Sequence, residues 1–285
     1  MNKSRSKTKM VPLPSQAIIP ERDATQRPIL EVYRLGINFG GLVAVEDFNI
    51  AVGRTEICGL IGPNGAGKTT IFNLLTKVYQ PTSGAILLDG KDTSNMNTAQ
   101  INRAGIARTF QNIRLFPSLS VEDNVKIGLH NEIGYNMGTG ILRLPAFYKA
   151  ERRAKERVMD LLNLFDMTHL ASHHAGSLPY GAQRRLEFVR ALATNPKLLL
   201  LDEPAAGMNP SETEELMSNI EKIRDQFQIA IMLIEHDMRL VMGICEGIAV
   251  LNYGQIIAKG TPKEIQTNPL VIEAYLGKKK GDQVC

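Results

Sequence analysis

The sequence is poor in cysteine: only Cys58, Cys245 and Cys285 occur, far apart and without a C-x-x-C pair. This disfavours a disulfide framework and fits a reduced cytosolic compartment. No apolar run approaches the ~18 to 20 residues of a membrane-spanning helix, and the basic N-terminus lacks the apolar segment of a secretory signal. The base-reading motif Asn-Lys-x-Asp is also missing, which disfavours a GTPase.

The net charge of +4 is mildly basic, and much of the excess lies at the two ends. Residues 1–28 mix Lys, Ser, Pro, Gln and Thr without periodicity, so we expect a disordered extension there. Residues 278–285 begin with three lysines and are expected to form a basic flexible tail. The folded part is then predicted to span residues 29–277, long enough for a large core.

The most informative stretch fits the phosphate-loop pattern G-x-x-x-x-G-K-[ST] at every fixed position. An apolar run precedes it and a run with helical apolar spacing follows, which favours strand, loop and helix over a turn that binds nothing. Backbone N–H groups and the helix N-terminus attract phosphate, Lys68 can reach the β- and γ-phosphates, and Thr69 can ligate Mg²⁺. The predicted ATP-binding residues are Gly62, Pro63, Asn64, Gly65, Ala66, Gly67, Lys68, Thr69 and Thr70.

A second motif is the apolar run 198–201 followed by Asp202 and Glu203. A buried strand that ends in acidic residues places carboxylates at the carboxyl edge of the sheet, where the phosphate loop also lies. Asp202 is predicted to hold Mg²⁺, usually through water, and Glu203 to act as the general base toward water. Capping residues can look similar, but the phosphate loop favours the functional interpretation.

The remaining pattern predicts an α/β fold. Two strands turn at Gly40-Gly41 and form an antiparallel N-terminal sheet. Helical patterns without strands occupy residues 112–182, which predicts a helical subdomain inserted in the core. Buried strands and helices then alternate, and a capping box at Thr261 begins the final helix. The expected core is a mixed sheet flanked by helices.

The segment 177–187 resembles the signature sequence of the ATP-binding cassette (ABC) family, in the variant with tyrosine before the glycine and two arginines after it. Tyr180 and Gly181 would open a helix whose N-terminus faces a γ-phosphate. In that family this phosphate belongs to the opposite subunit, so two chains hold two ATP molecules between them. An ordinary helix start is the alternative.

The resemblance assigns roles to further residues. Phe39 matches the aromatic residue that stacks on adenine, although a strand core residue is the alternative. Gln111 matches the glutamine that senses magnesium and faces the membrane partner. His236 matches the switch histidine that contacts the γ-phosphate. With Lys68 and Glu203, His236 is thus a predicted catalytic residue, and Thr69, Gln111 and Asp202 are the predicted magnesium residues.

Over residues 29–277 the chain is similar to the ATPases of branched-chain amino-acid importers, of the LivG type. The resemblance implies a second ABC ATPase subunit, two transmembrane permease subunits, an upstream solute-binding protein and a peripheral location on the cytoplasmic face of the inner membrane. It implies ATP-driven uptake of branched-chain or other hydrophobic amino acids. Another small solute such as urea, and a nucleic-acid-associated or regulatory protein, are the alternatives; no nucleic-acid partner is expected.

Three positions depart from the common pattern of the family. Pro179 occupies the place of a serine whose hydroxyl and N–H can contact phosphate, and proline supplies neither. Ala182 replaces the usual glutamine, and Asn209 stands where many cassettes carry aspartate. Since Gly181 and the helix start remain, we expect closure on one ATP site to be weakened, not abolished.

Overall fold

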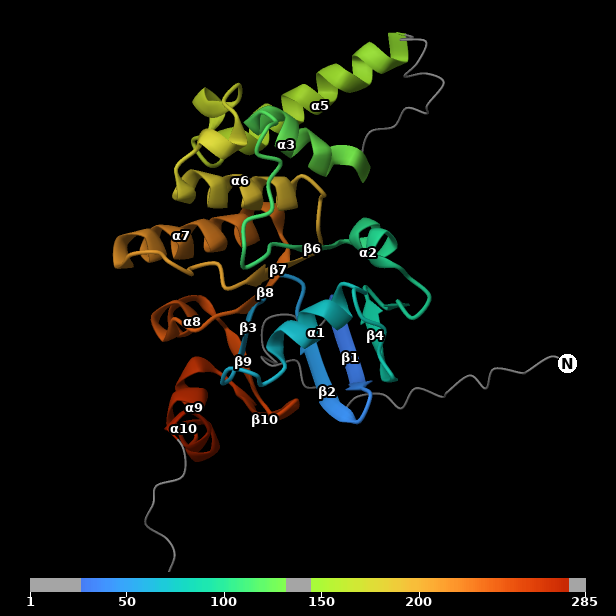
Figure 1. Ribbon diagram of the computed structural model, residues 1–285, viewed down its shortest axis with the longest axis vertical. Coiled ribbons are helices and arrows are strands. Elements are labelled where there is room, and N and C mark those ends of the chain that lie inside the picture. Colours follow the sequence, from blue (N-terminus) through green and yellow to red (C-terminus); the bar gives the residue numbers. More distant parts are fainter. Residues whose placement is uncertain (1–26, 132–144, 277–285) are drawn as a thin grey trace, which may run out of the picture.

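The computed structural model describes residues 27–131 and 145–276 (Figure 1). Most of the predicted N-terminal extension, the glycine-rich segment 134–140 and the basic tail 278–285 lie outside these ranges. Within them, no helix combines the length and the apolar character needed to cross a bilayer.

A six-stranded sheet forms the centre of the molecule. Five of its strands are parallel, and β10 joins the edge antiparallel to β9, so the sheet is mixed as predicted. In spatial order the strands are β10 (Gln255–Gly260), β9 (Gly247–Asn252), β3 (Ile57–Ile61), β8 (Ala230–Ile234), β7 (Leu198–Asp202) and β6 (Ile106–Arg108).

The central strands of this sheet are buried along their whole length because apolar side chains cover both faces. In β7, Leu199 and Leu201 join one hydrophobic cluster, whereas Leu198 and Leu200 join the other. This alternation follows from the two-residue period of a strand. The polar groups that follow β3, β7 and β8 are therefore held at one edge of a rigid sheet.

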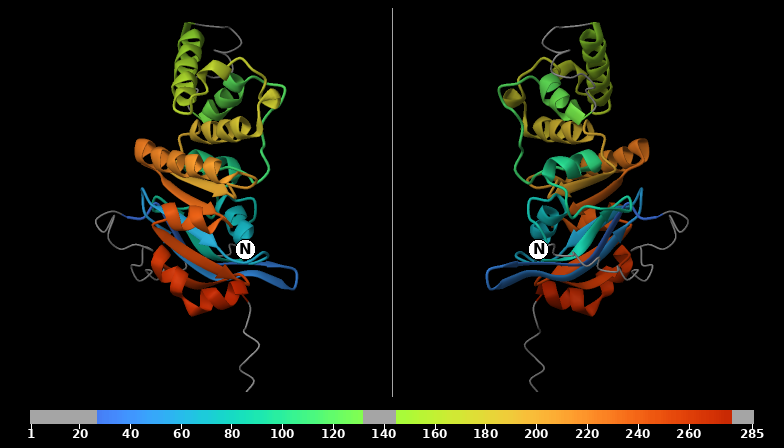
Figure 2. Two further views of the ribbon diagram at one scale, coloured as in Figure 1. Left: turned by 90° about the vertical axis from the view of Figure 1, so that its left-hand side faces the viewer. Right: turned by 90° about the vertical axis from the view of Figure 1, so that its right-hand side faces the viewer.

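A second, antiparallel sheet has the order β2-β1-β4-β5. The hairpin of β1 and β2 turns at Gly40 and Gly41, as expected, and projects from the side of the body (Figure 2). The bounds are β1 (Leu30–Phe39), β2 (Leu42–Val52), β4 (Ser83–Leu88) and β5 (Lys91–Asp92).

The helices gather at both ends and along the sheet (Figures 1 and 2). Next to the phosphate loop and the antiparallel sheet are α1 (Lys68–Leu75) and α2 (Thr98–Ala104). At one end lie α3 (Val121–Gly128), α5 (Pro145–Asn163) and α6 (Tyr180–Leu192), with short 3₁₀ turns η1 (Leu129–Asn131), η2 (Thr168–Leu170) and η3 (Ala175–Ser177). The others are α7 (Pro210–Phe227), α8 (Met238–Ile244), α9 (Pro262–Thr267) and α10 (Pro269–Leu276).

The α/β fold with its antiparallel N-terminal sheet and mixed core is confirmed. The helices α3, α5 and α6 pack on one another, and α3 and α5 fall in the predicted insertion. Its boundaries at 112–182 stay a prediction. The elements β5, α2 and β6 were not predicted, and the helix predicted to be final, α9, ends at Thr267 and is followed by α10. The Thr261 capping box is present, with Glu264 as its partner at the start of α9.

Candidate nucleotide-binding site

The phosphate loop connects β3 to α1 through backbone conformations that suit glycine. Gly65 and Gly67 have φ angles of 80° and 103°, in the left-handed region that other residues adopt at a cost. At Gly62 a Cβ atom would lie 2.0 Å from the carbonyl oxygen of Leu251 in β9. Glycine is therefore required here by close packing against the neighbouring strand, and the loop is held ready for an anion at the α1 N-terminus.

Lys68 begins α1, and its side chain folds back over the loop. The residue is 7% exposed, and its Nζ atom donates to the carbonyl oxygens of Gly62 at 2.6 Å and Pro63 at 3.0 Å. Burial lowers the pKa of Lys68, and the negative charges of Glu203 and Asp202 partly oppose this shift. The ammonium group thus lies among the loop carbonyls, with both carboxylates near enough to act on it.

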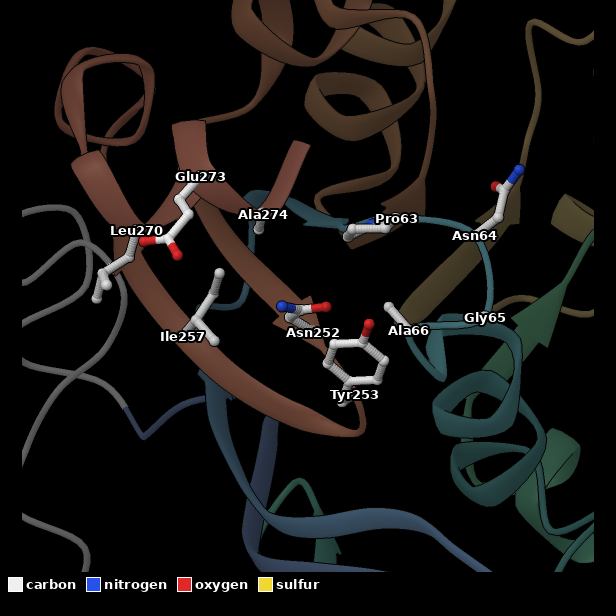
Figure 3. A pocket seen from close by; sticks show the side chains of 10 residues that line it. All are labelled: Pro63, Asn64, Gly65, Ala66, Asn252, Tyr253, Ile257, Leu270, Glu273 and Ala274. Carbon is white, nitrogen blue, oxygen red and sulfur yellow. The ribbon is translucent and has the colours of Figure 1, made fainter. Parts of the chain in front are cut away.

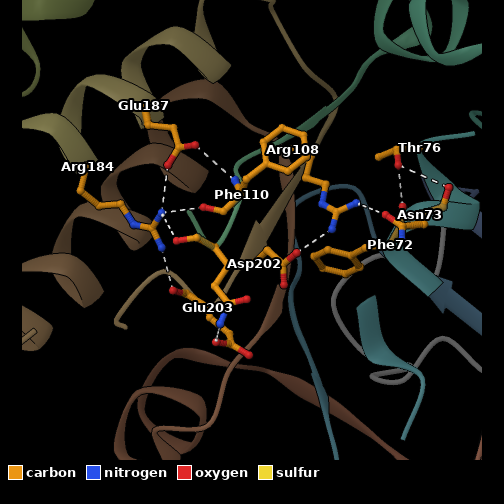
Figure 4. A network of polar contacts seen from close by, with 10 residues as sticks. Phe72, Asn73, Thr76, Arg108, Phe110, Arg184, Glu187, Asp202 and Glu203 are labelled. Carbon is orange, nitrogen blue, oxygen red and sulfur yellow. Dashed lines mark hydrogen bonds and ion pairs between the residues drawn. The ribbon is translucent and has the colours of Figure 1, made fainter. Parts of the chain in front are cut away.

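Asp202 ends β7 and is paired with an arginine that had no predicted role. The Nη2 atom of Arg108 lies 2.6 Å from Oδ2 of Asp202, and both side chains are almost fully buried. Arg108 also donates from Nη1 to the side chain of Asn73 in α1 at 2.7 Å, and its guanidinium packs on the rings of Phe72 and Phe110 (Figure 4). Arg108 therefore fixes the Asp202 carboxylate relative to α1.

Glu203 brings together three of the predicted site residues. Its Oε1 atom lies 2.9 Å from Nε2 of His236, and its Oε2 atom accepts a hydrogen bond of 2.5 Å from the Gln111 amide. The backbone of Glu203 has a φ of 48°, and such left-handed conformations of non-glycine residues are strained and concentrate at functional sites. Residues from two other loops, Gln111 and His236, thus contact the Glu203 carboxylate.

Glu235 was not singled out in the sequence, but it organises two of these loops. It is 3% exposed, and its Oε1 atom accepts from the N–H of Ala205 at 2.6 Å. Its Oε2 atom accepts from the N–H groups of His236 and Asp237 at 2.8 and 3.2 Å. One buried carboxylate therefore ties the loop after Glu203 to the loop that carries His236.

The signature residues lie at the N-terminus of α6. Tyr180 is 51% exposed, and a Cβ atom at Gly181 would meet no atom within 4 Å. Pro179 is the residue before the first turn, and it makes no side-chain cap. A glycine in open space is not needed for packing within the chain, so the space beside Gly181 is free for another molecule.

These residues do not line the same space as the phosphate loop. A hollow of about 120 Å³ beside Tyr180 and Gly181 is lined, among the described residues, by side chains of the α6 and α7 region. A larger hollow of about 480 Å³ lies against residues 63–66 and is bounded by the turn at Tyr253 and by α10 (Figure 3). Within this one chain, the phosphate loop and the signature are therefore two separate surfaces.

Two peripheral residues complete the description. Phe39 is 42% exposed at the tip of β1 and packs edge-to-face on Tyr79, with ring centroids 5.2 Å apart. It is not a core residue of the strand, which removes the alternative considered for it. Asn209 caps α7: its side-chain oxygen accepts from the N–H of Glu212 at 3.0 Å. Asparagine thus serves here as a helix cap.

An α/β sheet that carries a glycine-rich phosphate loop, a buried acidic strand end and the contacts of Gln111 and His236 with Glu203 is typical of P-loop nucleotide-binding proteins. The family model described as ABC transporter matches residues 45–206, and that of the branched-chain amino acid ATP-binding cassette transporter matches residues 255–280. The chain belongs to the ABC transporter ATP-binding family. It is an ATPase that binds ATP.

Named relatives cover nearly the whole chain. The high-affinity branched-chain amino acid transport ATP-binding protein BraF of Pseudomonas aeruginosa is 47% identical over 88% of this chain and 98% of its own. The LivG protein of Escherichia coli, with the same description, is 46% identical over the same shares. The lipopolysaccharide export ATP-binding protein LptB of Escherichia coli is 35% identical, over 84% of this chain and 93% of its own.

Solved structures agree with the fold. An ATP-binding cassette of an ABC transporter in its ADP conformation has a TM-score of 0.76 and 29% identity, over 89% of this chain and all of that one. A nucleotide-free cassette gives the same TM-score and identity over 88% of this chain.

Proposed function

We propose that this chain is the ATP-hydrolysing subunit of an importer for branched-chain or other hydrophobic amino acids. The observation that carries the catalytic part is the convergence of Gln111 and His236 on Glu203. The relatives BraF and LivG, which serve branched-chain amino acid transport, support the substrate class.

In the proposed reaction, water attacks the γ-phosphorus of ATP and the bond to the leaving ADP breaks, yielding ADP and phosphate. Glu203 accepts the proton of the attacking water, because its carboxylate is reachable and is oriented by two side-chain contacts. His236 holds the Glu203 carboxylate before nucleotide binds and contacts the γ-phosphate when it is present. Lys68 and the loop N–H groups bind the β- and γ-phosphates.

We also propose a magnesium site. Thr69 is an exposed residue at the start of α1, and Asp202, at the end of β7, is near enough to act on the charge of the neighbouring Lys68. Oxygen donors of this kind suit Mg²⁺, so Thr69, Asp202 through water, and Gln111 would hold it. When bound, the ion neutralises charge that develops on the phosphate oxygens. Since Gln111 donates to Glu203 in this structure, its amide would have to turn to serve the ion.

The ATP site is proposed to be shared between two subunits. Gly181 faces open space and lies on a different surface from the phosphate loop, as expected if each contacts a second ABC ATPase chain. Phe39, exposed at the tip of β1, would stack on adenine. Two transmembrane permease subunits and a solute-binding protein would complete the importer, with this chain on the cytoplasmic face of the inner membrane.

A vesicle assay tests this proposal. The full chain is co-purified with its membrane subunits, reconstituted, and ATP hydrolysis is measured with leucine, urea or nucleic acid added. Stimulation by leucine together with ATP-dependent leucine uptake is the expected result. Stimulation by nucleic acid without any membrane partner would contradict the transport proposal, and stimulation by urea alone would correct the substrate.

A further inference from the structure

Arg184, five residues after the proline of the signature, is the largest fully buried side chain among the described residues, with 1% of its surface exposed. Its Nη2 atom donates to the carbonyl oxygen of Glu203 at 2.7 Å, and its Nε atom donates to that of Pro204 at 3.3 Å. A side chain on α6 therefore holds the backbone immediately at the proposed catalytic base (Figure 4).

The other half of the guanidinium reaches a second loop. Its Nη1 atom donates to the carbonyl oxygens of Phe110 at 2.7 Å and Gln111 at 3.5 Å. The same atom lies 2.9 Å from Oε2 of Glu187, one turn further along α6. Glu187 accepts in turn from the N–H of Phe110 through Oε1 at 3.3 Å. Glu187 thus binds the backbone N–H of Phe110, and Arg184 binds its carbonyl oxygen.

These contacts go beyond what charge neutralisation requires. A buried guanidinium needs a partner for its charge and for each N–H group, and Glu187 neutralises the charge but accepts only from Nη1. The remaining donors are directed to carbonyl groups of residues 110, 111, 203 and 204, in two loops. Both loops carry predicted site residues, and the Gln111 and Glu203 side chains touch each other at 2.5 Å.

The Glu203 backbone is held from two sides. Its N–H donates to the carbonyl of Ile234 in β8 at 2.9 Å, and its carbonyl accepts from Arg184. Such restraint is needed because the residue has a φ of 48°, a conformation that persists only where the surroundings determine it. Without the guanidinium, one of the two restraints is lost.

We propose that Arg184 is a positioning residue for hydrolysis: through the carbonyls of Glu203 and Gln111 it holds the base and its glutamine partner against the signature helix. Gly181 lies on the same helix, three residues before Arg184. Movement of the first turn of α6 toward a nucleotide therefore displaces the loops of this chain's own base. The inference rests on the proposed role of Glu203 as the base.

The test compares Arg184→Gln and Arg184→Lys with the original full chain, assembled with its partner subunits. Single-turnover ATP hydrolysis, ATP affinity and thermal unfolding are measured for each. Displacement of a reacting group by about 1 Å can cost ~10²-fold in rate, so Arg184→Gln is expected to hydrolyse ATP ~10²-fold more slowly with unchanged ATP affinity. Arg184→Lys keeps the charge and some of the donors and is expected to recover part of the rate.

Arg224→Gln is the matched control. Arg224, in α7, has 13% of its side chain exposed and forms ion pairs with Glu246 and Asp225, neither of which lies in a site loop. It should lower the unfolding temperature without changing the rate per folded molecule. If the hydrolysis rate per folded molecule fell by a similar factor in Arg224→Gln and Arg184→Gln, Arg184 would act only through stability.

A double variant separates positioning from general damage. If Arg184 acts through Glu203, then adding Arg184→Gln to Glu203→Gln causes little further loss of hydrolysis rate. If Arg184→Gln does not fold, Arg184→Lys takes its place in the double variant. A multiplicative loss, or a wild-type rate in folded Arg184→Gln, would overturn the proposal. Glu203→Gln measured alone tests the base itself, so a failure of that assignment is seen separately.

Discussion

The Oε1 atom of Glu203 lies 2.9 Å from Nε2 of His236, although the two residues follow different strands of the sheet. The parallel pairing of β7 and β8 produces this relationship, because it aligns Asp202 with Ile234 and so brings the next loops together. Glu235, buried between them, fixes both loops by accepting backbone N–H groups from each.

Replacing Glu203 by glutamine should leave ATP binding intact and slow hydrolysis. The amide keeps the size of the side chain but accepts no proton, and a general base contributes about 10²- to 10⁴-fold. Phosphate release under saturating ATP, together with a nucleotide-binding measurement, checks this. Normal turnover would remove Glu203 as the base.

The pair of Arg108 and Asp202 should be costly to break. Both side chains are nearly inaccessible, and removing one partner of a buried pair typically destabilises a protein by about 3 to 5 kcal/mol. Arg108→Met should therefore lower the free energy of unfolding by that amount, measured by denaturant titration, and should slow hydrolysis as Asp202 loses its orientation.

Arg34→Gln serves as the comparison for Arg108. Its pair with Asp47 is exposed at 85% and 62% of the two side chains, and such pairs contribute ~0–1 kcal/mol. If the free energy of unfolding fell by a similar amount in the two variants, burial of the Arg108 pair would have no energetic consequence.

Pro179→Ser should raise turnover or prolong the closed dimer. Proline caps α6 without a side-chain hydrogen bond, whereas a serine at this position typically stabilises a helix by about 1 kcal/mol and adds a hydroxyl toward the phosphate. Pro262→Ser, in the first turn of α9, is the control. Equal single-turnover rates for Pro179→Ser and the original chain would refute the effect.

Asp89 gives the fold a defined acid sensitivity. Hydrogen bonds from Lys197 and Arg54 lower its pKa from 3.8 to about 2. Lys197 directly precedes β7, so its contact joins the antiparallel sheet to the central sheet. Because the folded-state pKa is the lower one, this stabilisation is present above pH 3.8 and is lost as the pH falls toward about 2.

Asp89→Asn isolates that contribution. Its unfolding temperature should lie below that of the original chain at neutral pH, and the difference should shrink between pH 3.8 and about 2. Asparagine tolerates the positive φ of 49° at this position. A difference that stayed constant down to pH 2 would show that the Asp89 charge has no part in it.

Local motifs made most of the site predictable. The phosphate loop and the acidic end of β7 are each one unbroken stretch of sequence, so the residue pattern alone indicated which side chains would face the nucleotide. Arg108 could not be found in this way, since it is 94 residues from Asp202 in sequence and no motif connects them. Arg184 belonged to a recognised variant of the signature, but its direction toward two loops follows only from the packing of α6.

The missed elements have similarly simple causes. β6 has three residues and β5 two, too few for a periodicity to appear, so only pairing with their neighbours defines them. α2 does have a local signal in the sequence, because Asn97 and Gln100 form a capping box at its start. Short elements that depend on long-range pairing are the part of this fold that local sequence determines least.

In the proposed enzyme, the ATP site is shared between two subunits. The most direct test of this sharing is size-exclusion chromatography of the Glu203→Gln chain, alone and with the second ATPase, with ATP and magnesium or with ADP. A shared site predicts a dimer with ATP that is lost in ADP and in Gly181→Glu, whose side chain would occupy the open space beside α6. Two results together would contradict a shared site. The Glu203→Gln chain would stay monomeric with bound ATP, both alone and with the second ATPase. The original chain would hydrolyse ATP at a rate per molecule that does not depend on its concentration.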